Sequence, residues 1–305
     1  MILSGAGRGG SEFRGPGDIR SELSVEGVSG EAVPVREDWS VPVCRGTMSK
    51  LQEGSIVEAW SWGIGLVLIA LMAGLARYHF WRPVKPMDRP RVLMYHSVGD
   101  GPATGMNVPP VTFARQLALL QRRGYDTCTM SELVARPGPC ERPTVALTFD
   151  DGFANNYDEV FPLLLKYQSK ATIYIAPHIE GIPQLTPAQI AEMAASGVIE
   201  FGAHTLTHIG LLRTSDDVAE AEIVGSKRAV EQLTGQPCLS FSYPYGRYSP
   251  THVSMVRAAG FTSAVSVRKA IEPLCNLFEI PRIGIHGRAD LLQFHIALTR
   301  GKYRL

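Results

Sequence analysis

Apolar residues follow three patterns along this chain, and each pattern predicts a different kind of segment. Residues 1–58 are rich in Gly, Arg, Ser and Glu and have no sustained helical or strand period, which predicts disorder. Residues 59–81 form a largely apolar run, whose centre at 63–76 carries no charged side chain. After a linker at 82–90, residues 91–305 alternate between short apolar runs and amphipathic stretches, which predicts one α/β domain.

The run at 59–81 has the length and the ends of a membrane-spanning helix. Roughly 20 apolar residues cross a bilayer, and aromatic side chains, here Trp60 and Trp81, are enriched at its two surfaces. The alternatives are a buried core helix and the apolar part of a signal peptide, but no small-residue cleavage site follows. We expect a single-pass anchor in the lipid bilayer, preceded by a segment in which Met48 is an alternative start.

Basic residues beside this run bear on which face of the membrane holds the domain. Arg45 and Lys50 precede the uncharged centre of the run, and five basic residues follow that centre: Arg77, Arg82, Lys85, Arg89 and Arg91. The positive-inside rule therefore places the domain in the cytoplasm. The substrate class inferred below usually lies outside the cell, so the two arguments disagree.

Seven apolar, often β-branched runs in the domain are predicted to be strands. They are 92–95, 145–149, 172–176, 199–202, 239–243, 262–267 and 278–283. Three amphipathic helices between them begin at capping residues and end at glycines, at 186–197, 215–235 and 249–260. This alternation predicts parallel strands with crossover helices. A barrel-like (β/α) architecture fits better than an open sheet, because the polar motifs are spread over many strands.

Composition excludes several classes of function. The net charge of +1, from 30 basic and 29 acidic residues, gives no electrostatic reason to expect nucleic acid as a partner. The five cysteines form no CxxC pair, so a cysteine-based zinc or redox site is not expected. They are Cys44, Cys128, Cys140, Cys238 and Cys275, and we expect free, mostly buried thiols. Nothing in the sequence indicates protein partners.

Four of the predicted strands run into polar groups at their carboxyl ends, where parallel α/β folds place their active sites. These groups are His96, the pair Asp150 and Asp151, the pair His204 and His208, and the turn 244–246. Each has an ordinary explanation when taken alone, as a helix cap, a half-buried histidine or a turn. The fold brings all four to one rim, which favours a shared site.

Two histidines and one carboxylate form a metal site of the catalytic type, because they leave a coordination position open. His204 and His208 are four residues apart, so both imidazoles lie on one face if the segment turns helical. We expect them to bind a divalent metal together with one carboxylate of the Asp150–Asp151 pair, while the other carboxylate acts as a base beside it. Zinc is the expected ion, although a carboxylate–imidazole set accepts several others.

The motifs "TFDDG" at 148–152 and "HTLTH" at 204–208 resemble the first two motifs of the NodB-homology polysaccharide deacetylases, carbohydrate esterase family 4. "FSYPYG" at 241–246 looks like the third motif. "VLMYHSV" at 92–98 is similar to the poly-β-1,6-N-acetylglucosamine deacetylase branch, in which the barrel is circularly permuted. The resemblance covers residues 91–305 and implies a distorted (β/α)7 barrel, which agrees with the seven predicted strands.

The resemblance also implies a role for each matching residue. Asp151, His204 and His208 correspond to the metal ligands. Asp150 corresponds to the base that takes a proton from the attacking water, and His96 to the acid that protonates the departing amine. The backbone N–H of Tyr245 corresponds to a donor that holds the oxyanion. His286 is a rival for the acid role.

Two departures from the family pattern affect these roles. Ser242 stands where many members carry an arginine that steadies the catalytic carboxylate, and Arg282 in the last predicted strand is a candidate replacement. No tryptophan follows Trp81, although the family often supplies one to the acetyl pocket. The residues expected to line that pocket instead are Phe153, Phe241 and Tyr243.

The resemblance implies a hydrolase acting on linear amide bonds, which removes acetyl groups from an N-acetylglucosamine-type polysaccharide or its lipid-linked precursor. Deacetylation of peptidoglycan or of chitooligosaccharides is an alternative, and so is a catalytically inactive, sugar-binding member of the fold. The intact set of acidic and imidazole residues argues against loss of activity, whereas Ser242 keeps the inactive alternative open.

Overall fold

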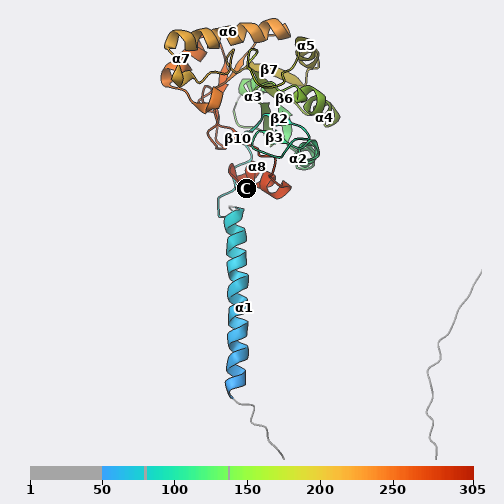
Figure 1. The fold of residues 1–305 in the computed structure, drawn as a ribbon, viewed down its shortest axis with the longest axis vertical. Coiled ribbons are helices and arrows are strands. Elements are labelled where there is room, and N and C mark those ends of the chain that lie inside the picture. Colours follow the sequence, from blue (N-terminus) through green and yellow to red (C-terminus); the bar gives the residue numbers. More distant parts are fainter. Residues whose placement is uncertain (1–49, 79–80, 137) are drawn as a thin grey trace, which may run out of the picture. The chain divides into compact units, whose positions relative to one another are not determined.

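The computed structural model of the chain describes residues 50–78, 81–136 and 138–305. Helix α1, Lys50–Arg77, contains residues 59–77 of the apolar run (Figure 1). Residues 50–58, predicted to be disordered, belong to this helix. The predicted disorder of residues 1–49, with the alternative start Met48, lies outside the described residues.

The segment Glu58–Ala76 of α1 has a mean hydropathy of 1.9 and is long and apolar enough, by length and composition, to cross a membrane. At 1.5 Å per residue its 19 residues extend about 28 Å, close to the roughly 30 Å of a hydrocarbon core. A signal sequence and a core helix meet the same criteria, so the helix by itself does not establish an anchor.

An eight-stranded, entirely parallel sheet forms the centre of the domain, in the order β10-β1-β5-β6-β7-β8-β9, with β4 paired to β5. Its strands are β1 Arg91–Tyr95, β4 Asp126–Cys128, β5 Thr144–Phe149, β6 Ala171–Ile175, β7 Ile199–Ala203, β8 Ser240–Ser242, β9 Ser263–Val265 and β10 Ile283–Gly284. A separate parallel pair joins β2, Ser97–Val98, to β3, Asn107–Val108. The predicted parallel α/β arrangement is therefore confirmed.

The sheet is curled, and one segment of chain touches both of its edges. Ile283 in β10 pairs with Leu93 of β1 at one edge, while Ile280 forms an isolated parallel bridge with Val265 of β9 at the other. The strand predicted over 278–283 is therefore short. Pro281 lacks an N–H group and interrupts the ladder between these two contacts.

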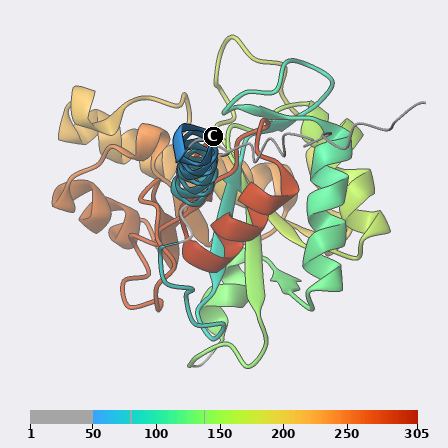
Figure 2. The ribbon, with the colours of Figure 1, turned by 90° about the horizontal axis from the view of Figure 1, so that it is seen from below.

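Helices surround the sheet, with α6 and α7 on one side and α2 and α4 on the other (Figures 1 and 2). The helices after α1 are α2 Pro110–Arg122, α3 Met130–Ala135, α4 Phe161–Lys166, α5 Pro187–Ala195, α6 Asp216–Thr234, α7 Pro250–Ala258 and α8 Leu291–Arg300. Capping boxes at Thr186 and Ser249 begin α5 and α7, as the sequence predicts, and Gly235 ends α6 in the left-handed conformation. Ser215 precedes α6 but makes no side-chain cap bond.

A fully buried arginine fastens the segment before β1 to the domain. Arg91, the first residue of β1, donates through Nε to the carbonyl oxygen of Leu298 in α8, at 2.8 Å. Its remaining donors reach backbone carbonyl oxygens of the predicted linker, those of Lys85, Pro86, Met87 and Arg89, and the sulfur of Met87. The Lys85 N–H also donates to the Thr299 oxygen at 2.7 Å. The segment 82–90 is thus hydrogen-bonded to the domain.

Candidate active site

The polar groups predicted from the sequence follow strands β1, β5, β7 and β8 at their carboxyl ends. Because these strands are parallel members of one sheet, the groups lie at the same end of the sheet, where the strands have their carboxyl ends. Backbone hydrogen bonds fix two of them to neighbouring strands. The Asp150 N–H donates to the Tyr95 oxygen and the His204 N–H to the Ile175 oxygen, both at 3.0 Å.

Asp151, His204 and His208 converge at this carboxyl end of the sheet. Oδ1 of Asp151 lies 3.6 Å from Nε2 of His204 and 3.4 Å from Nε2 of His208. One ligand atom from each residue lies within 4.8 Å of the others. Asp151 and His204 are buried, and the side chain of His208 is 15% exposed. The three residues predicted to hold a metal are therefore brought together.

The chemistry of the three donors fits a divalent cation. Oδ1 of Asp151 is buried and has no hydrogen-bond partner in the described part of the chain. Nδ1 of His204 lies 2.7 Å from the carbonyl oxygen of Ser242. Because a carbonyl only accepts, this nitrogen carries the proton, and Nε2 keeps its lone pair on the side of Asp151. Neutral imidazoles and an unsatisfied carboxylate oxygen are what a cation requires.

Burial sets the protonation of the three groups in the absence of a cation. Burial, with a contribution from the Asp150 charge, raises the pKa of Asp151 to about 7. Burial lowers the pKa of His204 to about 3 and also lowers the pKa of His208. The Arg282 charge acts in the opposite direction on Asp151 but does not outweigh these effects, and a bound cation would add the positive charge that stabilises the Asp151 carboxylate.

A loop connects the two histidines, so the helical turn considered in the sequence analysis is not formed. Residues 204–208 contain no helix, and Thr205 and His208 have positive φ of 62° and 59°. Glu222 in α6 accepts the N–H of Leu206 at 2.8 Å, the N–H of Thr207 at 2.9 Å and its hydroxyl at 2.8 Å. Sequence reasoning did not single out Glu222, because an acidic residue on an amphipathic helix carries no signal of this kind.

A left-handed turn separates the two adjacent carboxylates. Asp151 and Gly152 have φ of 75° and 74°. A Cβ atom on Gly152 would lie 2.7 Å from Cγ2 of Ile175, so only glycine fits there. The reversal sends Asp151 towards the imidazoles, while Asp150 contacts a different partner.

That partner is Arg282, which binds Asp150 with both ends of its guanidinium group. Nη1 lies 2.6 Å from Oδ1 and Nη2 lies 2.7 Å from Oδ2, and both side chains are buried. Burial alone would raise the pKa of Asp150, but the Arg282 charge outweighs it and holds that pKa far below its usual range. Arg282 thus makes the contact with the carboxylate that the sequence suggested.

Ser242 contributes to the same arrangement with both its side chain and its backbone. Its hydroxyl accepts from Nη2 of Arg282 at 3.0 Å, and its carbonyl oxygen accepts from His204. The remaining donors of Arg282 reach the Thr148 hydroxyl at 3.2 Å and the Ser266 carbonyl oxygen at 3.1 Å. A small residue at 242 therefore leaves room for a guanidinium that comes from the last strand.

The charge of Asp150 affects the pKa of His96 but not that of His286. Burial lowers the pKa of His96, and the charge of Asp150 acts in the opposite direction. Nδ1 of His96 is buried without a hydrogen-bond partner in the described residues, and Nδ2 of Asn156 donates to its backbone oxygen at 3.1 Å. His286 instead accepts the Arg288 N–H at Nδ1, at 3.1 Å. Of the two histidines, His96 is therefore the one whose pKa depends on the charge of Asp150.

Tyr245 stands in a tight turn against His208. It lies in the short 3-10 helix Pro244–Gly246, where Tyr245 and Gly246 have φ of 57° and 63°. Its ring centroid is 4.6 Å from that of His208, and 60% of the residue is exposed. This turn therefore sets the Tyr245 ring against His208, one of the three converging residues.

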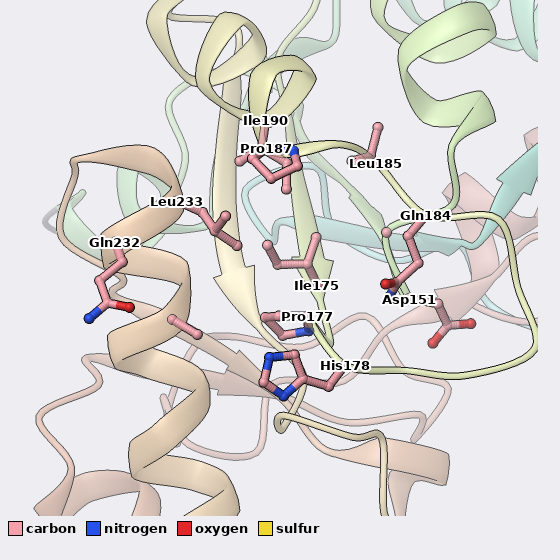
Figure 3. A pocket seen from close by; sticks show the side chains of 12 residues that line it. Asp151, Ile175, Pro177, His178, Gln184, Leu185, Pro187, Ile190, Gln232 and Leu233 are labelled. Atoms are coloured by element: carbon pink, nitrogen blue, oxygen red, sulfur yellow. The ribbon is translucent and has the colours of Figure 1, made fainter.

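A cavity of about 380 Å³ opens from Asp151 between α5 and α6. Figure 3 shows Asp151 at one end of it and Gln232 of α6 at the other. Its lining residues are Asp151, Gly152, Ile175, Pro177, His178, Gln184, Leu185, Pro187, Ile190, Ala229, Gln232 and Leu233. The expected pocket residues Phe241 and Tyr243 are buried in the core, and the Tyr243 hydroxyl donates to the Phe278 oxygen at 3.1 Å.

Comparison with known proteins gives related sequences. Residues 138–264 match the family model described as polysaccharide deacetylase. YxkH of Bacillus subtilis, a protein assigned to the polysaccharide deacetylases, is 33% identical over 186 residues, which cover 60% of this chain and 65% of YxkH. The poly-beta-1,6-N-acetyl-D-glucosamine N-deacetylase of Staphylococcus epidermidis is 26% identical over 194 residues, which cover 58% of this chain and 67% of that protein. The chain thus spans about two thirds of the length of these relatives.

Solved structures share the fold. The Streptococcus pyogenes deacetylase PplD in complex with acetate has a TM-score of 0.60 and 27% identity, and the match covers 66% of this chain and 93% of that one. IcaB from Ammonifex degensii has a TM-score of 0.61 at 24% identity, over 69% of this chain and 96% of that one, which shows the fold alone. With the family match and the site geometry, these similarities identify a polysaccharide deacetylase domain of the NodB-homology type in this chain, a type of domain found in hydrolases that act on amide bonds.

Proposed function

We propose that this protein is a metal-dependent hydrolase that removes acetyl groups from an N-acetylglucosamine-type polysaccharide or its lipid-linked precursor. The observation that carries the proposal is the convergence of Asp151, His204 and His208 beside the buried Asp150–Arg282 pair. Membership of the deacetylase family supports it, as does the similarity to a poly-N-acetylglucosamine deacetylase.

Asp151, His204 and His208 would hold the cation, and zinc is the ion we expect. A divalent ion there supplies Lewis acidity, which polarises an amide carbonyl and lowers the pKa of water from ~15.7 to about 7. His204 is kept in the required tautomer by the Ser242 oxygen, and Glu222 holds the loop that carries His208.

Asp150 is the proposed base. Its pairing with Arg282 keeps the carboxylate ionised and orients it, so that it accepts the proton that water loses as the new C–O bond forms. His96 then protonates the nitrogen as the C–N bond breaks, because an amine is a poor leaving group without a proton. Burial lowers the pKa of His96, but the charge of Asp150 favours the protonated imidazole. A positioned acid or base contributes roughly 10²–10⁴ in rate.

The backbone N–H of Tyr245 is the proposed donor to the oxygen that becomes negative during the reaction. The support is the left-handed turn at Tyr245 and Gly246, together with the contact between the Tyr245 ring and His208. Removing one such donor typically costs about 10²–10³ in rate. The products are acetate and a free amino sugar.

Acetate release tests the proposal. The full chain is treated with a chelator, divided, and assayed on β-1,6-linked N-acetylglucosamine oligomers, chitooligosaccharides and peptidoglycan fragments, with and without added zinc. We expect acetate from at least one substrate only after zinc is restored, and none from the Asp151→Asn variant. Uptake of the metal with no acetate from any substrate would support the inactive, sugar-binding alternative.

We also propose that α1 anchors the chain in a bilayer by a single span. Its apolar segment Glu58–Ala76 supports this, and so do Trp60 and Trp62 at the start of that segment. Carbonate extraction of membranes that contain the full chain should leave it in the membrane fraction. Cleavage after α1, seen as a shortened mature chain, would instead identify a signal sequence. Protease protection then reports the face that carries residues 91–305.

We infer, finally, that the curled sheet is a distorted, circularly permuted (β/α)7 barrel. The support is the segment that touches both edges, with Ile280 bridging to β9 and Ile283 pairing with β1. A crystal structure in which the β9 and β10 edges are separated by solvent would contradict this inference.

A further inference from the structure

A second hollow lies beside the candidate metal residues, on the side of Tyr245. Its volume is about 270 Å³. Its lining residues are Thr207, His208, Ile209, Gly210, Leu212, Arg213, Tyr245 and Arg247. It shares His208 with the candidate metal set, so a group bound in it lies next to the reacting sugar.

The charge of this hollow is positive. Arg213 and Arg247 are exposed, and neither makes an ion pair with any residue that the structure describes. None of the residues that line the hollow is acidic. Two uncompensated guanidinium groups at one small hollow attract an anion and repel an ammonium group.

The backbone holds the two arginines at the hollow. Arg213 ends the short 3-10 helix Leu211–Arg213, and its N–H donates to the Gly210 oxygen at 2.8 Å. Arg247 follows the turn that carries Tyr245, and its N–H donates to the Pro244 oxygen at 3.2 Å. The two guanidinium groups therefore reach the hollow from two tight turns, which limits the freedom of their Cα positions.

An apolar platform accompanies the charge. The ring of Tyr245 is tilted against His208, and Tyr245 and Leu212 are 60% and 55% exposed. Sugar rings present C–H faces that pack against aromatic rings, while guanidinium groups bind the two oxygens of a phosphate or carboxylate. The hollow thus combines a surface for a sugar with donors for an oxyanion.

Another hollow that borders Tyr245 has a different charge. It is lined by Glu180 together with His178, Ile179, Thr207, His208 and Tyr245. A glycan that occupies both hollows therefore meets a carboxylate in one and two arginines in the other. This asymmetry orients a substrate that carries an anion at one end.

We propose that Arg213 and Arg247 form an arginine subsite, which binds a phosphate or carboxylate carried by the substrate next to the sugar that is deacetylated. The proposal rests on the proposed deacetylase function and names its substrate as an anionic amino-sugar glycan. A free glucosamine, which is cationic, is disfavoured in the arginine subsite. Phosphate and carboxylate share the oxyanion chemistry, and the test separates them.

The test compares matched oligomers that differ in one group. Acetate release is measured in low salt for a neutral N-acetylglucosamine oligomer, for the same oligomer with a phosphate monoester, and for one with a carboxylate on the neighbouring sugar. The wild-type chain should prefer one or both anionic oligomers. The Arg213→Gln/Arg247→Gln variant should reduce that preference in kcat/KM by roughly tenfold, since each exposed ion pair contributes up to about fivefold. The effect should shrink as salt is raised.

Two further variants sharpen the result. Arg213→Lys/Arg247→Lys keeps the charge and should retain part of the preference. Arg228→Gln removes an exposed arginine of α6 that does not line the hollow, and should leave the preference unchanged. A preference for the phosphate oligomer alone or the carboxylate oligomer alone supports the subsite and identifies its ligand.

Failure of the subsite and failure of the proposed function give different results. If the wild-type chain deacetylates the neutral oligomer and shows no preference that depends on Arg213 and Arg247, the subsite is overturned and the deacetylase remains. If no oligomer releases acetate, binding of the phosphorylated oligomer is measured by calorimetry. Equal affinity of the wild-type chain and the double variant then overturns the subsite as well.

Discussion

Arg282 donates hydrogen bonds to both carboxylate oxygens of Asp150, at 2.6 and 2.7 Å, although the two residues are 132 positions apart in the sequence. Both side chains are buried, so the charge of each depends on the other. The same guanidinium also binds Ser242, whose backbone oxygen orients His204. One buried arginine therefore connects the proposed base to a candidate metal ligand.

Replacing Arg282 should separate its effect on stability from its effect on activity. Arg282→Ala leaves Asp150 buried without a partner, which should cost about 3–5 kcal/mol of unfolding free energy and most of the acetate release. Arg282→Ala/Asp150→Asn removes the stranded charge and should recover stability in urea unfolding, but not activity. Unchanged turnover in Arg282→Ala would count against the assignment of Asp150 as the base.

Removal of the cation should be visible without any substrate. A chain stripped by chelator should bind one zinc ion, and zinc at 100 times its dissociation constant should stabilise the fold by about 2.7 kcal/mol. Asp151→Asn and His208→Gln should abolish this stabilisation, because each removes one of the converging ligand atoms. Calorimetric titration and thermal unfolding measure both effects. Equal zinc affinity in the variants would place the ion elsewhere.

Glu222 should influence metal affinity although it touches no candidate ligand atom. Glu222→Ala removes the acceptor for two backbone N–H groups and one hydroxyl in the loop between the histidines. Loss of such supporting contacts typically weakens metal binding by about 10–100-fold. Glu220→Ala, on the exposed face of the same helix, is the matched control and should bind zinc like the wild-type chain.

Gly246→Ala should disrupt the turn that carries Tyr245. The new Cβ would clash with both methyl groups of Val267, at a residue whose φ is positive. We expect a loss of about 1–3 kcal/mol from overpacking together with reduced kcat. Gly235→Ala also has a positive φ but meets no atom within 4 Å, so it should cost only about 1 kcal/mol and preserve kcat. Similar losses of kcat in both variants would show that the turn at Gly246 has no specific role in catalysis.

The buried cysteines should resist alkylation while the fold persists. Burial raises the pKa of Cys128 and of Cys238 to about 12, whereas Cys275 is exposed. At pH 8 the two buried cysteines have a very small thiolate fraction. Their alkylation by iodoacetamide should therefore be roughly 10³-fold slower than that of an ordinary thiol. Mass spectrometry of peptides after timed labelling measures each cysteine separately. Rapid labelling of Cys128 in the folded chain would contradict its position in the core.

Local signals allowed much of the fold to be predicted from the sequence. The apolar run at 145–149 became β5, and the capping residues Thr186 and Ser249 began helices as expected. The strand β4, with the sequence Asp-Thr-Cys, contains no apolar run and depends on its pairing with β5. Short strands of this kind are determined by tertiary contacts, which sequence patterns do not contain.

The candidate site divides in the same way. The strand ends predicted that Asp151, His204 and His208 lie close together, because parallel strands bring their carboxyl ends together. The conformations that aim these side chains were not predictable, since non-glycine residues rarely adopt positive φ and carry no signal when they do. Glu222 contacts the loop from helix α6, and no local sequence pattern predicts this contact.

The order of synthesis gives the Arg282 contact a further consequence. Asp150 leaves the ribosome 132 residues before Arg282, and Arg91 leaves 207 residues before Leu298, whose oxygen it binds. While it is being synthesised, the chain therefore carries the proposed base without the guanidinium group that binds it. The proposed hydrolysis needs this pair, so we expect it to begin only after β10 has been translated and paired with β1.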